Sequence, residues 1–199
     1  MDNWKNVLDE NILKANINFG AVFVMNYECL KEFVIEQVRS FYSEHFYMDG
    51  DRIVCEESDT YKKKVRNLDK NLENASLKWF MDAEALTQED YDIYQKIRKR
   101  RNDITHELLK NLNIGFGEED AQLFSDMLRI YNKLDKWWIN EIEIPTSADD
   151  IPEDYDRDGV CGGQALMLSI INEIVFGNEG DKYKELLNKL MKSDMSDFV

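Results

Sequence analysis

Proline and glycine are scarce in this sequence, which has two prolines, Pro145 and Pro152, and nine glycines among 199 residues. Proline interrupts a helix because it lacks a backbone N–H and its ring clashes with the preceding turn. Since no proline precedes Pro145, long helices are permitted over almost the whole chain before it. This scarcity is the first indication of an all-α protein.

Long apolar runs and paired cysteines are also missing. No stretch reaches the roughly 18 uninterrupted apolar residues of a membrane span, and the first residues, MDNWKNVLDENILKANINFG, carry acids and amides where a secretory signal needs a basic start and an apolar run. Cys29, Cys55 and Cys161 are widely spaced and fit neither a zinc site nor a disulfide framework. We therefore expect a soluble, cytoplasmic protein with no membrane association, metal or cofactor.

Basic residues are outnumbered, with 25 Lys and Arg against 40 Asp and Glu, for a net charge of -15. Nucleic-acid binding normally draws on a broad basic surface, so the composition argues against a protein that coats itself in nucleic acid. Basic residues do gather at Lys62 to Arg66 and Lys96 to Arg101, while Glu118 to Asp158 is crowded with acids. A local basic site on an acidic body stays open beside the commoner interpretation, ordinary charged helix faces.

Apolar residues recur at helical spacing along most of the chain. The predicted helices are one long helix from Ile12 to about Tyr42, bent near Gly20; shorter ones over Ser58 to Asn71 and Ala75 to Ala85; one from a capping box at Thr87 to about Asn111; one over Glu118 to about Ile142; and two closing helices, Ala165 to Phe176 and Lys182 to Lys192. Asp49 and Gly50 mark a turn whose flanks form either a small hairpin or a plain loop.

These elements predict a single all-α domain over residues 1–199, an antiparallel bundle of about five to seven helices. We expect four helices of roughly 20 residues or more, a core bundle at about 12–143, and C-terminal helices at 164–193. The connection between them, residues 144–163, is longer than loops in compact domains usually are, which is typical of functional or mobile segments.

The run RNDITHEL, Arg101 to Leu108, holds one of only two histidines in the chain. On a helical wheel Arg101 falls in the middle of the apolar arc, and Asn102 and His106 fall together at its edge. An unpaired guanidinium in a core is too costly, so Arg101 must meet a carboxylate or face a wet cleft. The run therefore predicts an inward-facing polar site at a helix interface.

A permanent cation, an amide and a group that exchanges a proton near neutral pH are the parts that metal-independent RNA cleavage needs. A general base takes the proton of a ribose 2'-hydroxyl, the oxygen attacks the adjacent phosphate, and the cation stabilises the charge on the phosphoryl oxygens. One chain supplies a single histidine here, whereas cleavage uses a base and an acid. Two copies that face each other across a dimer would supply both.

Arg101, Asn102 and His106, in the run RNDITH, resemble the motif of the HEPN family, in which an arginine and a polar residue precede a histidine on one helix of an all-α bundle. That family includes ribonuclease toxins and phage-defence nucleases. The resemblance implies a homodimeric, metal-independent hydrolase of toxin–antitoxin or defence type, with RNA as substrate and an antitoxin-like protein partner. Arg101 would stabilise the phosphate, His106 would be the acid or base, and Asn102 would orient them.

The resemblance covers about ten residues firmly, and Leu108 stands where some family toxins carry a tyrosine. Another interpretation stays open, in which Arg101 pairs with an acid across the bundle, Asn102 lies on the surface and His106 has no special role. The protein would then be a non-catalytic helical module whose acidic face, around Glu118 to Asp158, docks a basic protein partner.

Two acidic motifs point to divalent cations, but neither is complete. DYDRDG, Asp154 to Gly159, matches the first half of a calcium loop, yet Ala165 stands where the closing carboxylate should be. Glu89 and Asp92 are spaced like a magnesium-binding pair of the all-α nucleotide pyrophosphohydrolases, but no matching second pair follows. An acidic surface loop and an ordinary helix face are the favoured interpretations.

Overall fold

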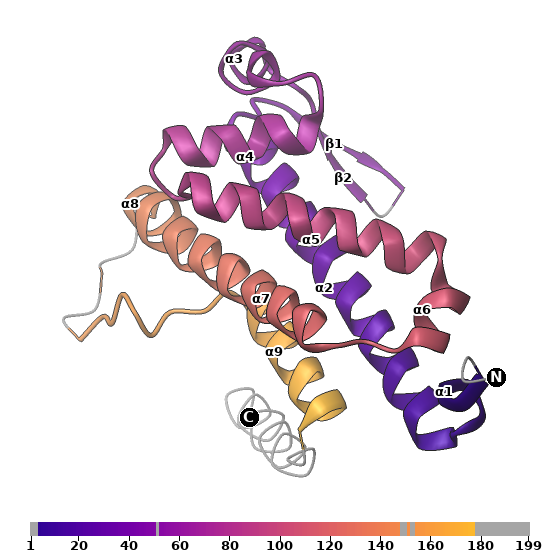
Figure 1. The fold of residues 1–199 in the computed structure, drawn as a ribbon. Helices are drawn as coiled ribbons and strands as arrows, with labels where there is room; N and C mark the ends of the chain where they lie inside the picture. The colour runs from indigo at the N-terminus through magenta and orange to yellow at the C-terminus, as the bar shows by residue number, and fades with distance from the viewer. Residues whose placement is uncertain (1–3, 51, 148–150, 152–153, 178–199) are drawn as a thin grey trace.

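The computed structural model describes residues 4–50, 52–147, 151 and 154–177, with the backbone alone for 52–55. Its elements are α1 (Lys5–Leu8), α2 (Glu10–Phe41), β1 (Phe46–Asp49), β2 (Arg52–Cys55), α3 (Asp59–Lys64), a 3₁₀ turn (Arg66–Leu68), α4 (Leu72–Asp82), α5 (Gln88–His106), α6 (Leu108–Ile114), α7 (Glu118–Trp138), a π-helical turn (Ile139–Glu143), α8 (Ile144–Thr146) and α9 (Gly163–Phe176). The predicted all-α bundle is confirmed (Figure 1).

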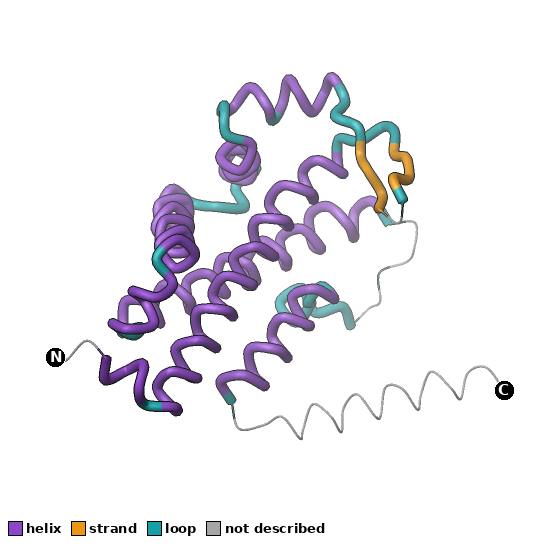
Figure 2. Tube along the Cα trace, turned by 90° about the vertical axis from the view of Figure 1, so that its right-hand side faces the viewer, coloured by secondary structure: helices purple, strands orange, loops and turns teal. Residues whose placement is uncertain are grey.

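The long helix α2 is the central element of the bundle and contacts α4, α5, α7 and α9 (Figures 1 and 2). Asp9 caps its first turn by accepting hydrogen bonds from the backbone N–H groups of Asn11 and Ile12. The buried face of α2 includes Phe23, Leu30 and Val34. It packs against apolar residues of the other helices, among them Phe80, Ile97, Ile104, Ile130 and Leu134. The sequence placed this helix within two residues at its start and one at its end.

Gly20 does not interrupt α2, and its role is to admit a neighbouring side chain. A Cβ at this position would lie 3.3 Å from Cζ of Phe116. The aromatic ring of Phe116 packs against Phe19, which precedes Gly20 on α2, with ring centroids 4.8 Å apart. The glycine thus lets the connection that follows α6 lie close against α2.

A pair of buried amides joins α2 to α9. Asn26 Nδ2 donates to Oδ1 of Asn172 at 2.8 Å, and Asn172 Nδ2 donates back to Oδ1 of Asn26 at 3.0 Å. Both side chains are buried. Because each amide satisfies the other, the pair avoids the cost of burying an unpaired polar group.

Asp90 joins α5 to α7. It completes the predicted capping box with Thr87, and its carboxylate also accepts from Arg129 at 2.7 Å and from Lys133 at 2.6 Å. Burial by itself raises the pKa of Asp90, but the hydrogen bonds from Lys133, Arg129 and Thr87 outweigh it and hold that pKa well below its usual range. The carboxylate therefore stays charged inside the bundle.

Several predicted boundaries are wrong. The helix predicted to run to Asn111 ends at His106, and α6 follows after a break at Glu107, whose φ of -122° and ψ of 38° are not helical. At the other end of the bundle the backbone stays helical through Thr146, so the connection begins later than 144. Of the described helices, α2, α5 and α7 have 19 residues or more, whereas α4 and α9 have 11 and 14, so the expectation of four long helices is not met there.

The structure also tests the predicted turn at Asp49 and Gly50 and the predicted helix over Ser58 to Asn71. The turn at Asp49 and Gly50 closes a two-stranded antiparallel hairpin, in which Phe46 pairs with Cys55. The segment Ser58 to Asn71, predicted as one helix, forms α3 and a 3₁₀ turn. The predicted helix Lys182 to Lys192 lies outside the described residues. No described helix is long and apolar enough to cross a membrane.

Candidate functional site

Arg101 lies on the face of α5 that packs against α2, with 23% of its side chain exposed. Its Nη2 forms an ion pair with the carboxylate of Glu28, and its Nη1 donates to Oδ1 of Asn102 at 2.9 Å. The guanidinium carbon lies 5.3 Å from the ring centroid of Tyr27, a cation–π contact. Arg101 thus meets a carboxylate, one of the two environments that its position on the wheel required.

A buried carboxylate fixes the ring beneath Arg101. Glu73 of α4 accepts hydrogen bonds from the hydroxyls of Tyr27 at 2.6 Å and Tyr94 at 2.7 Å, and its other oxygen lies 3.6 Å from Nη1 of Arg98. Burial first, and then the hydrogen bond and charge of Glu73, raise the pKa of Tyr27 far above its ordinary value. Both tyrosines therefore remain neutral donors, and α2, α4 and α5 meet at this carboxylate.

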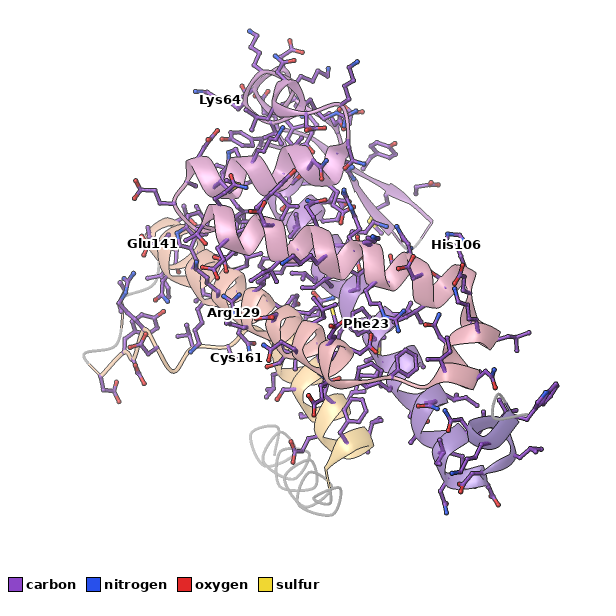
Figure 3. All side chains as sticks on the ribbon, in the orientation of Figure 1. Phe23, Lys64, His106, Arg129, Glu141 and Cys161 are labelled. Carbon is purple, nitrogen blue, oxygen red and sulfur yellow. The ribbon has the colours of Figure 1, made fainter. Side chains whose placement is uncertain are left out.

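His106 is the last residue of α5, and its side chain is exposed at the rim of the bundle (Figure 3). Among the described residues, no hydrogen bond or ion pair involves its imidazole, whereas Arg101 is paired and in contact with α2. Asn102 is exposed as well. The structure therefore joins Arg101 to Asn102 but does not place His106 in contact with either residue within one chain.

The basic cluster Lys96 to Arg101 is largely neutralised by internal partners. Arg98 donates to Asn74 at 2.8 Å beside Glu73, and Arg100 pairs with Asp120 at 2.5 Å and donates to Asn111 at 2.8 Å. Lys96 and Lys99 are exposed. The arginines thus tie α5 to α4, α6 and α7, and the local basic surface is smaller than the sequence indicates.

An apolar groove begins one helical turn from the Arg101 and Glu28 pair. It has a volume of about 290 Å³ and lies between α2 and the end of α5, lined by Ile17, Gly20, Ala21, Val24, Ile104, Thr105, Leu108 and Leu112. Exposed apolar side chains continue from it over α1, the first turns of α2, and α6, namely Leu8, Ile12, Ile17, Leu108, Leu109 and Ile114. A surface of this kind is typical of a protein–protein contact.

The long connection before α9 folds back on the end of α7. Nδ2 of Asn140, in the π-helical turn, donates to the carbonyl of Arg157 at 3.0 Å, and its Oδ1 accepts from the hydroxyl of Tyr155 at 2.8 Å. The carboxylate of Asp135 accepts from the backbone N–H of Gly162 at 2.7 Å. Desolvation raises the pKa of Asp135, and the bond from Gly162 offsets only part of that rise.

Neither acidic motif forms a metal site in the part of the chain that is described, where no group of three or more His, Cys, Asp or Glu side chains could hold an ion. In the DYDRDG segment, Asp156 accepts from the backbone N–H of Asp158 at 3.0 Å, a turn contact. Asp92 accepts from Gln88 at 2.9 Å on the exposed side of α5. These acids have local structural roles.

The sequence singled out Arg101, Asn102 and His106 as candidate residues, but it did not identify Tyr27, Glu28 and Glu73. Tyr27 and Glu28 fit the long amphipathic pattern of α2, and Glu73 stands in the first turn of α4, where acids are common. Only the need of Arg101 for an anion signalled that such a carboxylate exists.

Comparisons with family models, with curated proteins and with solved structures find no match to this chain. The resemblance to the HEPN family therefore stays an expectation from the motif residues Arg101, Asn102 and His106.

Proposed function

We propose that this protein is a HEPN-like, metal-independent endoribonuclease that acts as a homodimer. The observation that carries the proposal is the hydrogen bond from Arg101 to Asn102, because the resemblance implies that the polar residue after the arginine supports it. His106 stands at the end of the same helix with its imidazole exposed, available to a substrate or a second copy.

The dimer would complete the acid–base pair. His106 of one copy would take the proton of a ribose 2'-hydroxyl, and His106 of the other would give a proton to the leaving 5'-oxygen. Arg101 would stabilise the charge that builds on the phosphoryl oxygens as the 2'-oxygen attacks. The exposed apolar side chains beside this site, Leu108 and Leu109 foremost, would be covered by the second copy.

The test is cleavage of end-labelled RNA by the purified full chain in the presence of EDTA. We expect His106→Ala to lower the rate by roughly 10²- to 10⁴-fold and Arg101→Ala by roughly 10²- to 10³-fold. His45→Ala is the matched control, because His45 is the other histidine and is also exposed. Cleavage that His106→Ala leaves unchanged, or no cleavage by the wild-type chain, would sink the proposal.

A second candidate function is a non-catalytic binding module. The observation that favours it is the ion pair between Arg101 and Glu28, which gives the arginine a structural partner within the chain. In this case the acidic face around Glu118 to Asp158 would bind a basic protein. A chain that leaves RNA intact but binds polylysine at low salt, and loses that binding when acids of this face are neutralised, would support the module.

A further inference from the structure

Both terminal nitrogens of Arg101 are engaged in the chain as it stands. Nη2 is paired with Glu28, Nη1 donates to Asn102 at 2.9 Å, and Nε is buried with no hydrogen-bond partner. A guanidinium binds carboxylates and phosphates with the same donor geometry. Glu28 therefore occupies the place on Arg101 that a phosphate oxygen would take, and a phosphate must displace it.

Glu28 has a second cation within reach. Its Oε2 lies 3.3 Å from Nζ of Lys31 on the same helix, while its Oε1 pairs with Arg101 on α5. The side chains of Glu28 and Lys31 are 39% and 37% exposed, so both can move without unpacking the core. Side chains three positions apart on a helix pair readily. The carboxylate can thus leave Arg101 and keep a counter-charge.

The other groups around Arg101 do not compete for this exchange. Arg98 is held by Asn74 and Glu73, and the hydroxyl of Tyr27 is committed to Glu73. Asn102 is neutral. When Glu28 leaves, the ring of Tyr27 and the amide of Asn102 still hold the guanidinium, which then has an unpaired positive charge at a half-buried position.

We propose that Arg101 is an oxyanion site whose resident occupant is the carboxylate of Glu28, and that a phosphate group takes its place while Glu28 turns to Lys31. The inference rests on the proposed function for its natural ligand, a phosphodiester of RNA. Anion binding itself is independent of cleavage. The site is latent in the free chain, and any anion that binds there pays for breaking one ion pair.

The test follows the side-chain ¹⁵Nε resonance of Arg101 in the full chain, assigned by its loss in Arg101→Lys. Inorganic phosphate is titrated at constant ionic strength against sodium chloride, and a 2'-O-methyl dinucleotide, which cannot be cut, is titrated in parallel. Glu28→Gln should bind both about two- to fivefold more tightly, the range expected for removal of a partly exposed ion pair. Tighter binding of phosphate alone would identify a free phosphate ion as the ligand.

Glu36→Gln is the matched control, because Glu36 is an exposed acid on the same helix that pairs with Arg39 at 2.8 Å. It changes the net charge equally and should leave binding unchanged. An affinity of Glu28→Gln no higher than that of Glu36→Gln, or no shift of the Arg101 resonance in any variant, would overturn the inference.

Lys31 could either receive the displaced carboxylate of Glu28 or bind phosphate directly, and a double-mutant cycle separates these two roles. Lys31→Met should weaken phosphate binding in the wild-type background, because Glu28 loses its second partner, and should have no effect in the Glu28→Gln background. An equal loss in both backgrounds would mean that Lys31 binds phosphate directly, and displacement of Glu28 onto Lys31 would be wrong. A chain that binds as expected but leaves RNA intact keeps this inference and loses the ribonuclease proposal.

Discussion

Tyr27 donates a 2.6 Å hydrogen bond to the buried carboxylate of Glu73, and its ring lies beneath the guanidinium of Arg101. Glu73→Ala would leave the hydroxyls of Tyr27 and Tyr94 without their acceptor inside the bundle. We expect the free energy of unfolding to fall by about 2–5 kcal/mol, measured by urea denaturation. Glu36→Ala, at an exposed site, should change it by less than about 0.5 kcal/mol, and equal effects would contradict the role given to Glu73.

Asp90 should make the protein acid-sensitive. Its pKa is depressed in the folded state, so its stabilising effect is present above the unfolded pKa of roughly 4 and is lost as the pH falls toward the folded value. At pH 7, Asp90→Asn should cost about 2–4 kcal/mol, because Arg129 and Lys133 lose a charged partner. The difference in the free energy of unfolding between the wild type and Asp90→Asn should narrow from pH 4 to pH 2. A difference that stays constant would speak against this linkage.

Asp135 should have the opposite effect on the pH dependence of folding stability. Desolvation raises its folded pKa, so its contribution is favourable below the unfolded pKa and is lost as the pH rises through the folded value. Asp135→Asn keeps an oxygen to accept from the N–H of Gly162 and removes the buried charge. We expect the variant to be more stable than the wild type at pH 7 and equal to it below about pH 4. Lower stability at pH 7 would show that the charge is favourable there.

Leu109 tests the proposed dimer without disturbing the fold. Its side chain is 83% exposed, so Leu109→Asp should change folding stability by less than about 0.5 kcal/mol. In sedimentation velocity, the wild-type chain should have the mass of a dimer and the variant that of a monomer. Met167→Asp, at a position of α9 that is 63% exposed, should remain dimeric. A Leu109→Asp chain that sediments as the wild type does would exclude α6 from the interface.

Helical periodicity predicted the bundle well because the buried faces of α2, α5 and α7 are long and regular. The break at Glu107 was missed because Leu108 and Leu109 continue the helical spacing of apolar residues. There the side chain of Asn111 donates to the carbonyls of Asp103 and Glu107, a local side-chain contact across the break that apolar periodicity does not reveal. Local pattern therefore predicts an element better than it predicts where the element stops.

The sequence likewise indicated one part of the candidate site and not the residues around it. The wheel predicted that Arg101 needs an anion, but it could not name Glu28, which lies 73 positions away in the sequence. Nor could it show that Arg98 and Arg100 are committed to partners on other helices. A single sequence thus identifies a charged side chain on an apolar helix face, whereas only the structure identifies the residue that pairs with it.

The paired amides of Asn26 and Asn172 limit how this protein can change in evolution. Replacing both with apolar residues removes two polar groups together and can be nearly neutral. Replacing Asn26 alone takes both of these hydrogen bonds from the buried amide of Asn172, and replacing Asn172 alone leaves Oδ1 of Asn26 without its donor, although Nδ2 of Asn26 keeps its bond to the carbonyl of Val22. The polar and apolar versions of this contact are therefore separated by a less stable single mutant. Homologues that have lost one asparagine should therefore have lost the other as well, so that the two residues are inherited or replaced together.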